Sequence, residues 1–293
     1  MKPDLLDHYL PVAKKLALEA GHLVLSYLDP KIKKEKKPDQ SVVTKADLEA
    51  DKLITSNLHK AFPDHGILSE EGGFIGNKNS KWIWVIDPLD GTRAFAEAKP
   101  GFCVMIGLLH DKKPTLGVVY DPLEKRLYFA TKGHGAFLNH SPSSLSLPLE
   151  EGRPVLSMSK GTQGEGEPSH KLTVSSRSNL SIMPLVISTG FPTDDLQKIQ
   201  KNLTGPILKP INSVGIKVGF LVRKEADIYV NHHEVQYWDT VAPQIILEEA
   251  GGKFTKLDGS ELNYDLKNKS FSHESKTLAT NGRKHDEIVN FVI

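Results

Sequence analysis

Residues 84–95 read WVIDPLDGTRAF, and this stretch decides the fold because its character changes halfway along. Bulky apolar residues run up to Asp87 and stop there, and a second aspartate, Asp90, follows three residues later. The apolar run is typical of a strand that is covered on both faces. Pro88 and Gly91 then favour a tight turn. Because ligands usually bind where the strands of such sheets end, this turn is a candidate site.

The turn has a structural interpretation and a chemical one. Asp–Gly is a strong hairpin signal, and the second copy, at Asp258–Gly259, needs no chemistry. However, a three-residue turn brings the carboxylates of Asp87 and Asp90 to one side of the chain, where they repel by roughly 4 kcal/mol at an effective dielectric of about 20. A divalent cation relieves this repulsion, and ligands that are all oxygen favour a hard ion such as Mg²⁺.

Gly91 and Thr92 give the same turn a second use. A glycine lets backbone N–H groups approach a phosphate closely, and a helical turn after it would aim its positive end at that anion. Carboxylates, a metal and a phosphate cradle in one turn predict metal-assisted transfer of a phosphoryl group to water. The sequence shows no nucleophile signature that would require a covalent phosphoenzyme.

Three other carboxylates have structural interpretations that compete with a catalytic one. Asp47 follows Thr44 by three residues, as in a helix capping box. Asp239 lies where an acid would complement the start of a helix. Glu70 can be an ordinary loop charge. Each of them alone is more often structural, so the metal site depends on their grouping with the acidic turn.

Hydrophobic periodicity predicts a chain of mixed helices and strands. The expected helices span residues 12–27, 44–61, 193–203, 214–222 and 238–250, the last stopped by Gly251–Gly252. The expected strands span residues 65–68, 81–86, 102–109, 115–120, 126–130, 171–176 and 227–231, with a strand pair about Asp258–Gly259. The strands between 102 and 130 are separated by turn residues and form a meander.

The composition argues against several classes of protein. The net charge of +1 gives no reason to expect nucleic acid or an acidic membrane surface as a partner. The single cysteine, Cys103, permits no intrachain disulfide. The N-terminal residues lack the apolar core of a signal peptide, and the longest apolar run is too short to span a bilayer. We therefore expect a soluble cytoplasmic protein.

The length of 293 residues suggests one large domain or two halves. The Ser/Pro-rich segment 140–154 and the Gly-rich segment 159–170 are typical of surface excursions, and we place the seam between the halves there. This predicts an N-terminal α+β half, residues 1–155, and a C-terminal α/β half, residues 156–293. The lysine-rich segment 31–41 is interpreted as a solvated loop.

Four motifs resemble the inositol monophosphatase superfamily, the Mg²⁺-dependent and lithium-sensitive phosphatases. In chain order they are SVVTKAD, ILSEEGG, WVIDPLDGT and WDTVAPQIILEEAGG. The resemblance covers nearly the whole chain. It implies an α/β (α+β) fold, namely a layered αβαβα sandwich with one sheet in each half.

Within that superfamily the chain most resembles the 3′(2′),5′-bisphosphate nucleotidases. Arg93 follows Thr92 as a basic residue, as it does in many of them. Pro243 stands where the inositol phosphatases tend to have a small residue, and VSSRS resembles the central strand motif of the nucleotidases. The Gly-rich segment before KLTVSS departs from the compact forms of the family.

The resemblance implies a set of metal ligands. Glu70 and Asp87 would hold the first Mg²⁺, together with the backbone carbonyl of Leu89. Asp87, Asp90 and Asp239 would hold the second ion. The family binds two or three ions, and the N-terminal half would carry most of the ligands, with Asp239 as the last one from the C-terminal half.

The resemblance also implies catalytic and substrate-binding residues. Asp47 and Thr92 would orient or deprotonate the attacking water, with Glu70 assisting. The scissile phosphate would lie against Gly91 and Thr92. The remaining substrate contacts implied are Asp90, Asp239, Ser176, Arg177, Ser213 and Lys217, the last four near the nucleotide, where a positive group suits the phosphate that is kept.

The leading functional hypothesis is hydrolysis of the 3′-phosphate of adenosine 3′,5′-bisphosphate to give AMP and phosphate by attack of a metal-activated water. The alternative is hydrolysis of inositol monophosphate or another sugar phosphate by the same site. A third hypothesis is a metal-dependent binding or regulatory protein that is not an enzyme. The expected partner is a small nucleotide or sugar phosphate, without nucleic acid or membrane. The sequence leaves open whether the protein is a monomer or a homodimer.

Overall fold

The structure is a computed structural model, which describes residues 3–28, 35–36, 42–43, 45–140, 149–150, 153–154, 169–268 and 270–292. Thr44, most of the lysine-rich loop and most of both excursions expected between residues 140 and 170 lie outside these ranges. Two short ladders are described next to them, β1 (Glu35–Lys36) with β2 (Val42–Val43) and β10 (Leu149–Glu150) with β11 (Arg153–Pro154). No helix in the described ranges is long and apolar enough to cross a membrane.

The larger sheet has eight strands in the order β12-β9-β8-β7-β6-β5-β3-β4. Neighbouring strands are antiparallel except for β3 and β5, which run parallel. The strands are β3 (Gly66–Ser69), β4 (Gly73–Gly76), β5 (Trp82–Asp90), β6 (Cys103–His110), β7 (Lys113–Asp121), β8 (Arg126–Thr131), β9 (Gly135–His140) and β12 (His170–Leu172). The central position of β5 explains its continuous run of apolar residues, since both of its faces are covered.

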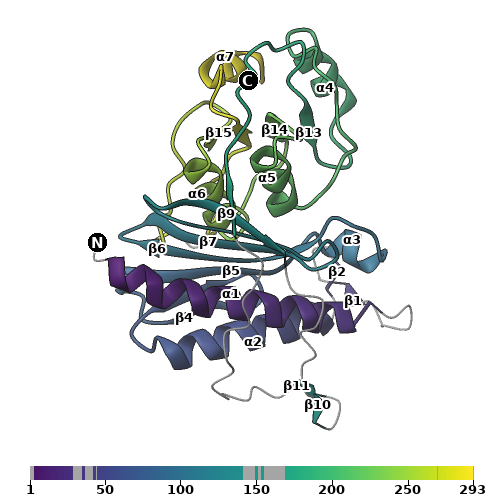
Figure 1. Ribbon diagram of the computed structural model, residues 1–293. Helices are drawn as coiled ribbons and strands as arrows, with labels where there is room; N and C mark the ends of the chain where they lie inside the picture. Colours follow the sequence, from purple (N-terminus) through teal and green to yellow (C-terminus); the bar gives the residue numbers. More distant parts are fainter. Residues whose placement is uncertain are drawn as a thin grey trace.

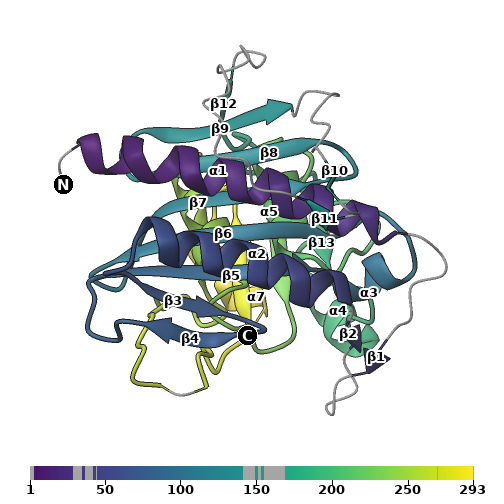
Figure 2. The same cartoon turned by 90° about the horizontal axis from the view of Figure 1, so that it is seen from below.

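Two long helices cover one face of this sheet, α1 (Pro3–Ser26) and α2 (Lys45–Ala61). Figure 2 shows them side by side, roughly along the direction of the strands. Leu16 of α1, Ile54 of α2 and Trp84 of β5 belong to one cluster of buried apolar side chains there. This packing fixes α2, whose first turn carries Asp47, on the outside of the sheet.

The smaller sheet has four strands in the order β13 (Leu185–Ile187), β14 (Ile228–Asn231), β16 (Thr277–Thr280) and β15 (Lys253–Lys256). Figure 1 shows α5 (Val214–Val222) and α6 (Val241–Glu249) between the two sheets, and α4 (Thr193–Gln200) and α7 (His285–Val292) on the outer side of the smaller one. The layers therefore run αβαβα, as the family resemblance implies, although β12 of the larger sheet comes from beyond residue 155.

Close packing brings α6 directly onto the larger sheet. Gly107 of β6 and Gly117 of β7 face this helix, and a Cβ atom at either glycine would meet Val241 or Ala242. Because the helix can lie this close, Asp239, two residues before its start, comes near the end of β5. The close contact between α6 and the larger sheet thus places Asp239 near residues that are far from it in the sequence.

Most helices and strands predicted from the sequence are confirmed, although α1 begins at Pro3 instead of residue 12 and β5 continues to Asp90 instead of residue 86. Two predicted strands differ more. The strand expected over residues 171–176 ends at Leu172, because the N–H of Val174 is bonded to the carbonyl of Ala250 instead. The strand pair about Asp258–Gly259 is reduced to the single bridge of Thr255 with Glu261, because β15 pairs with β16. The division of the chain after residue 155 stays a prediction.

Candidate metal and phosphate site

Strand β5 continues through both aspartates to Asp90, instead of stopping before a tight turn at Asp87 as the sequence predicts. Asp87 lies opposite Met105 and Asp90 opposite Cys103, so the register with β6 shifts by one residue between them, as in a β-bulge, and the chain turns only at Gly91. The N–H of Leu89 donates to Oδ1 of Asp87 at 3.0 Å. The bulge changes the direction of the strand end, and the carboxylates of Asp87 and Asp90 lie close together there.

The glycine that follows is required by the backbone. Gly91 has a φ of +91°, in the left-handed region, and it precedes the short helix α3 (Thr92–Ala96). A Cβ atom at Gly91 would collide with the carbonyl oxygen of Gly101. The turn therefore places backbone N–H groups and the Thr92 side chain beside the aspartates, as a phosphate cradle requires.

Three carboxylates meet at this point. Oxygen atoms of Asp87, Asp90 and Asp239 lie within 4.8 Å of one another, which is a spacing suited to holding a metal ion. Asp87 and Asp90 are buried, at 2% and 7% exposure, and Asp239 is half-buried. Asp239 comes from the loop before α6, where Thr240 is the N-cap and Oδ2 of Asp239 accepts a hydrogen bond from the N–H of Gln236 at 2.7 Å.

One oxygen of Asp90 is held by the C-terminal half of the chain. Its Oδ2 accepts hydrogen bonds from the Ser213 hydroxyl at 2.6 Å and from the Gly215 N–H at 2.9 Å. Ser213 is also the N-cap of α5, and its oxygen accepts from the N–H of Ile216. The hydrogen bonds that Asp90 accepts from described residues all end on Oδ2, so Oδ1 is available for another ligand.

The carboxylates raise one another's pKa values. Burial, followed by the charges of Asp90 and Glu70, raises the pKa of Asp239 to about 8. Burial and the charges of Glu70 and Asp90 also raise the pKa of Asp87 well above its usual range. Without a cation, such a cluster keeps protons at neutral pH. A divalent cation would stabilise the ionised form, so the residues fit a hard metal ion.

Glu70 and Asp47 lie around this cluster. Glu70 follows β3 directly, and its backbone N–H donates to the carbonyl of Ile86 at 3.2 Å. Asp47 is in the first turn of α2, with a side chain that is only 1% exposed. The charges of both residues raise the pKa of Asp87, so both act on the same site although they are outside the set of three.

A cavity of about 310 Å³ opens from the carboxylates. Its lining includes five residues of the sequence prediction, Asp90, Gly91, Thr92, Lys217 and Asp239, and the neighbouring Arg93. Residues that the sequence analysis missed line the rest of it, namely Ser188, Thr189, Asn212, Val214, Tyr229, Asn231, His233, Glu234 and Val235. The alternation of side chains along β14 is a signal that could have placed Tyr229 and Asn231 on one face.

Lys217 is the most unusual of these residues because it is completely buried. Its ammonium donates to the Ser188 hydroxyl at 2.7 Å and to the Asn212 carbonyl at 3.1 Å, and lies 4.4 Å from the ring centre of Tyr229. Burial lowers its pKa to about 7, although the charges of Asp90 and Asp239 oppose this shift. The cavity therefore has an amine at its wall whose protonated, positively charged form would be favoured when an anion binds beside it.

Three of the four residues predicted to lie near a nucleotide, namely Ser176, Arg177 and Ser213, are not among the described residues that line the cavity. Ser176 is exposed, and Arg177 forms an ion pair with the buried Asp227, with its Nε 2.5 Å from Oδ2. A second guanidinium nitrogen of Arg177 donates to the carbonyl of Lys224. The Arg177 side chain is therefore held by Asp227 and Lys224, away from the cavity. The Ser213 hydroxyl is likewise used in its hydrogen bond to Asp90.

Comparisons with known proteins agree with this fold. The model of the inositol monophosphatase family matches residues 5–290. The chain is 32% identical to an inositol-1-monophosphatase of Synechocystis, over 98% of this chain and 89% of that protein. It is 30% identical to a histidinol-phosphatase of Mycobacterium tuberculosis, over 86% and 85% of the two chains. A solved IMPase structure of Thermotoga maritima superposes with a TM-score of 0.76 at 26% identity, covering 97% of this chain and 96% of the other.

Proposed function

The chain belongs to the inositol monophosphatase family, and from this membership we propose that it is a Mg²⁺-dependent phosphomonoesterase that acts on a small phosphorylated metabolite. The observation that carries the proposal is the gathering of Asp87, Asp90 and Asp239 beside the turn at Gly91. These carboxylates can hold a cation, and the turn can hold the phosphate that the cation neutralises.

Each residue around the turn has a role in this proposal. Asp87, Asp90 and Asp239 would hold Mg²⁺, with Glu70 and the Leu89 carbonyl completing the ligands. Bound magnesium supplies an acidic water and positive charge for the phosphate oxygens. Asp47 and Thr92 would orient that water and accept its proton, and the backbone N–H groups at Gly91 and Thr92 would bind the phosphate.

For the substrate, we propose adenosine 3′,5′-bisphosphate, which would lose its 3′-phosphate to give AMP. The support for this choice is Lys217, because a buried ammonium at the cavity wall suits a second anionic group on the substrate. The 5′-phosphate that is kept would provide that group. The free-energy cost of burying the charged Lys217 would then be offset by this phosphate when the substrate binds.

A second candidate is inositol monophosphate. It is favoured by the name of the Synechocystis relative, whose similarity extends over 98% of this chain. A single phosphate on a polyol leaves Lys217 without an anionic partner on the substrate. The two candidates therefore differ in whether this lysine contributes to substrate affinity.

Phosphate release from a panel of substrates tests both the proposed Mg²⁺-dependent phosphatase activity and the proposed nucleotide substrate. The panel contains adenosine 3′,5′-bisphosphate, inositol 1-phosphate, histidinol phosphate and fructose 1,6-bisphosphate, each with Mg²⁺, with EDTA, and with Mg²⁺ plus Li⁺. We expect Mg²⁺-dependent release that Li⁺ suppresses, with the highest kcat/KM for the nucleotide. Higher kcat/KM for inositol 1-phosphate would overturn the nucleotide assignment. Nucleotide binding without turnover of any substrate would overturn the enzymatic proposal.

A further inference from the structure

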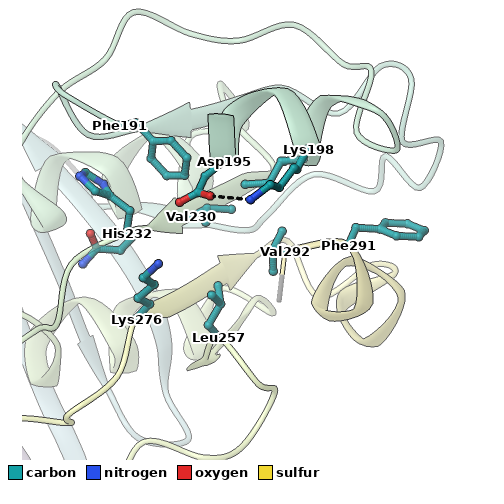
Figure 3. A pocket seen from close by; sticks show the side chains of 11 residues that line it. Phe191, Asp195, Lys198, Val230, His232, Leu257, Lys276, Phe291 and Val292 are labelled. Atoms are coloured by element: carbon teal, nitrogen blue, oxygen red, sulfur yellow. Dashed lines mark hydrogen bonds and ion pairs between the residues drawn. The ribbon is translucent and has the colours of Figure 1, made fainter. Parts of the chain in front are cut away.

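A second cavity lies on the outer side of the smaller sheet. It measures about 180 Å³ and opens between α4 and α7, over the end of β14. Its walls come from segments far apart in the sequence, and Figure 3 shows them facing one another. The residues that line it are Phe191, Asp195, Lys198, Ile199, Val230, Asn231, His232, Leu257, Lys276, Phe291 and Val292.

This cavity is separate from the metal site but shares a strand with it. Side chains alternate along β14, so Tyr229 faces the metal site and Val230 faces the second cavity. The alternation continues past the end of the strand, where His233 borders the first cavity and His232 the second. Asn231, at the end of the strand, borders both cavities. The second cavity is therefore not an extension of the predicted phosphate site.

The body of the second cavity is apolar. Val230 and Val292 are buried in its wall, and Phe191 and Leu257 close two of its sides. The ring of Phe191 also packs on that of His232, with 4.8 Å between the ring centres. Such walls favour a ligand with an apolar body, because its transfer from water is favourable.

The charged groups at the cavity leave one positive charge without compensation. Asp195 pairs with Lys198, its Oδ1 3.3 Å from Nζ. Lys276 points across the cavity toward Asp195 in Figure 3, yet no carboxylate of a described residue lies within ion-pair distance of it. Burial and the nearby charges of His233, Lys217 and Lys276 lower the pKa of His232 to about 4, so this imidazole is neutral at pH 7.

The Nδ1 atom of His232 offers no polar contact to a ligand in this cavity. It has no hydrogen-bond partner among the described residues, but protein atoms cover it almost completely. The cavity thus combines apolar walls with one uncompensated ammonium.

We propose that this cavity is a second ligand site, which binds a small monoanion with an apolar body, such as an aromatic carboxylate. The ring would lie among Phe191, Val230 and Leu257, and the carboxylate would face Lys276. Inorganic anions fit less well, since they cannot use the apolar walls. Neutral aromatic compounds fit less well because they leave Lys276 without an anionic partner.

Calorimetric titration with benzoate tests the proposal on the full chain. Benzamide has the same shape without the charge, and acetate has the charge without the ring. We expect benzoate to bind at one site, and both comparison compounds to bind at least about tenfold more weakly. Benzamide or acetate binding as tightly as benzoate, or no binding of benzoate, would overturn the proposal.

Three variants locate the benzoate. Lys276→Gln should weaken binding by about fivefold to tenfold, since it removes the charge that faces the carboxylate. Lys201→Gln is the matched control, an exposed lysine just after α4 that does not line the cavity, and should bind as the wild type does. Lys217→Met should also retain binding, since Lys217 lines the other cavity. Any other pattern overturns the proposal, above all loss in Lys217→Met with retention in Lys276→Gln, which would place the benzoate at the metal site.

Discussion

At the scale of single residues, Asp87 and Asp90 lie buried within reach of each other and of Asp239. If they hold the metal, Asp87→Asn or Asp90→Asn should lower kcat by more than about a hundredfold. The metal-free Asp87→Asn protein should be at least as stable as the wild type, because the substitution removes a carboxylate from a repelling cluster. Phosphate release and thermal unfolding in EDTA measure the two effects.

The matched control for these variants is Asp258→Asn, in the other Asp–Gly turn. Asp258 is exposed, and its Oδ1 accepts hydrogen bonds from Ser260 that an asparagine oxygen can also accept. Activity in this variant should stay within about twofold of the wild type. Full activity in either Asp87→Asn or Asp90→Asn would disprove the site assignment.

Lys217 separates the two candidate substrates. Lys217→Met keeps the length of the side chain and removes its charge, so KM for adenosine 3′,5′-bisphosphate should rise by about tenfold or more. KM for inositol 1-phosphate should change by less than about threefold, because that substrate has no second phosphate. Initial rates over a range of substrate concentrations give both values. Equal changes in KM for the two substrates would argue against a contact of Lys217 with the 5′-phosphate.

The sequence could predict the aspartates of the site but not their partners. Asp87 and Asp90 are three residues apart after a strand, so their proximity is a local property. Ser188 and Asn212 reach Lys217 only because separate segments of the second half fold together. Ser213 caps the helix that it begins, which is a local role, but its bond to Asp90 spans the two halves and has no local signal.

At the scale of elements, the turn between β5 and α3 depends on a glycine that cannot be replaced. Gly91→Ala combines a left-handed φ with a collision against the Gly101 carbonyl, so it should lower the free energy of unfolding by more than about 3 kcal/mol. Gly259→Ala is the matched control, with a φ of +83° and only ordinary side-chain neighbours, and should cost about 1–2 kcal/mol. Denaturant unfolding of both variants measures the difference. Equal losses would show that the turn at Gly91 tolerates a side chain.

Helices and strands with strong periodicity were predictable because their pattern is local. The apolar run of β5 and the amphipathic faces of α1 and α2 required no knowledge of the rest of the chain. The two differences both arise from pairing at a distance. Residues after Leu172 turn toward Ala250, and β15 pairs with β16, which begins only after the intervening residues 257–276.

At the scale of the whole molecule, the candidate metal site joins the larger sheet to the helices that lie between the two sheets. Asp87 and Asp90 end a strand of the larger sheet, whereas Asp239 precedes the helix between the sheets. A cation held by all three would link these layers, in addition to their apolar contacts and the hydrogen bonds that Asp90 accepts from Ser213 and Gly215. Binding of Mg²⁺ to the folded state should therefore raise the unfolding temperature.

The size of this Mg²⁺ effect should increase with pH between 5 and 7. In the metal-free folded state Asp239 has a pKa of about 8, whereas the same carboxyl in the unfolded chain ionises near 4. The metal-free folded state thus holds extra protons, and its stability falls as pH rises through this window. Because Mg²⁺ displaces those protons, the increase in unfolding temperature that it produces should be about 5 °C or more larger at pH 7 than at pH 5.

Other groups also titrate in this pH range. The quantity to measure is therefore the difference in unfolding temperature between the Mg²⁺-bound and the metal-free protein at each pH. His273 and His285 have pKa values lowered to about 4, so they make stability rise with pH below about 6.5, whether or not Mg²⁺ is bound. Lys217, whose pKa is lowered to about 7, makes the free energy of unfolding rise with pH mainly above pH 7. Calorimetric scans at pH 5, 6 and 7, each with Mg²⁺ and with EDTA, cancel the histidine contribution. An Mg²⁺ effect that is the same at all three pH values would mean that the ion does not displace protons from these carboxylates, and that it binds elsewhere on the molecule.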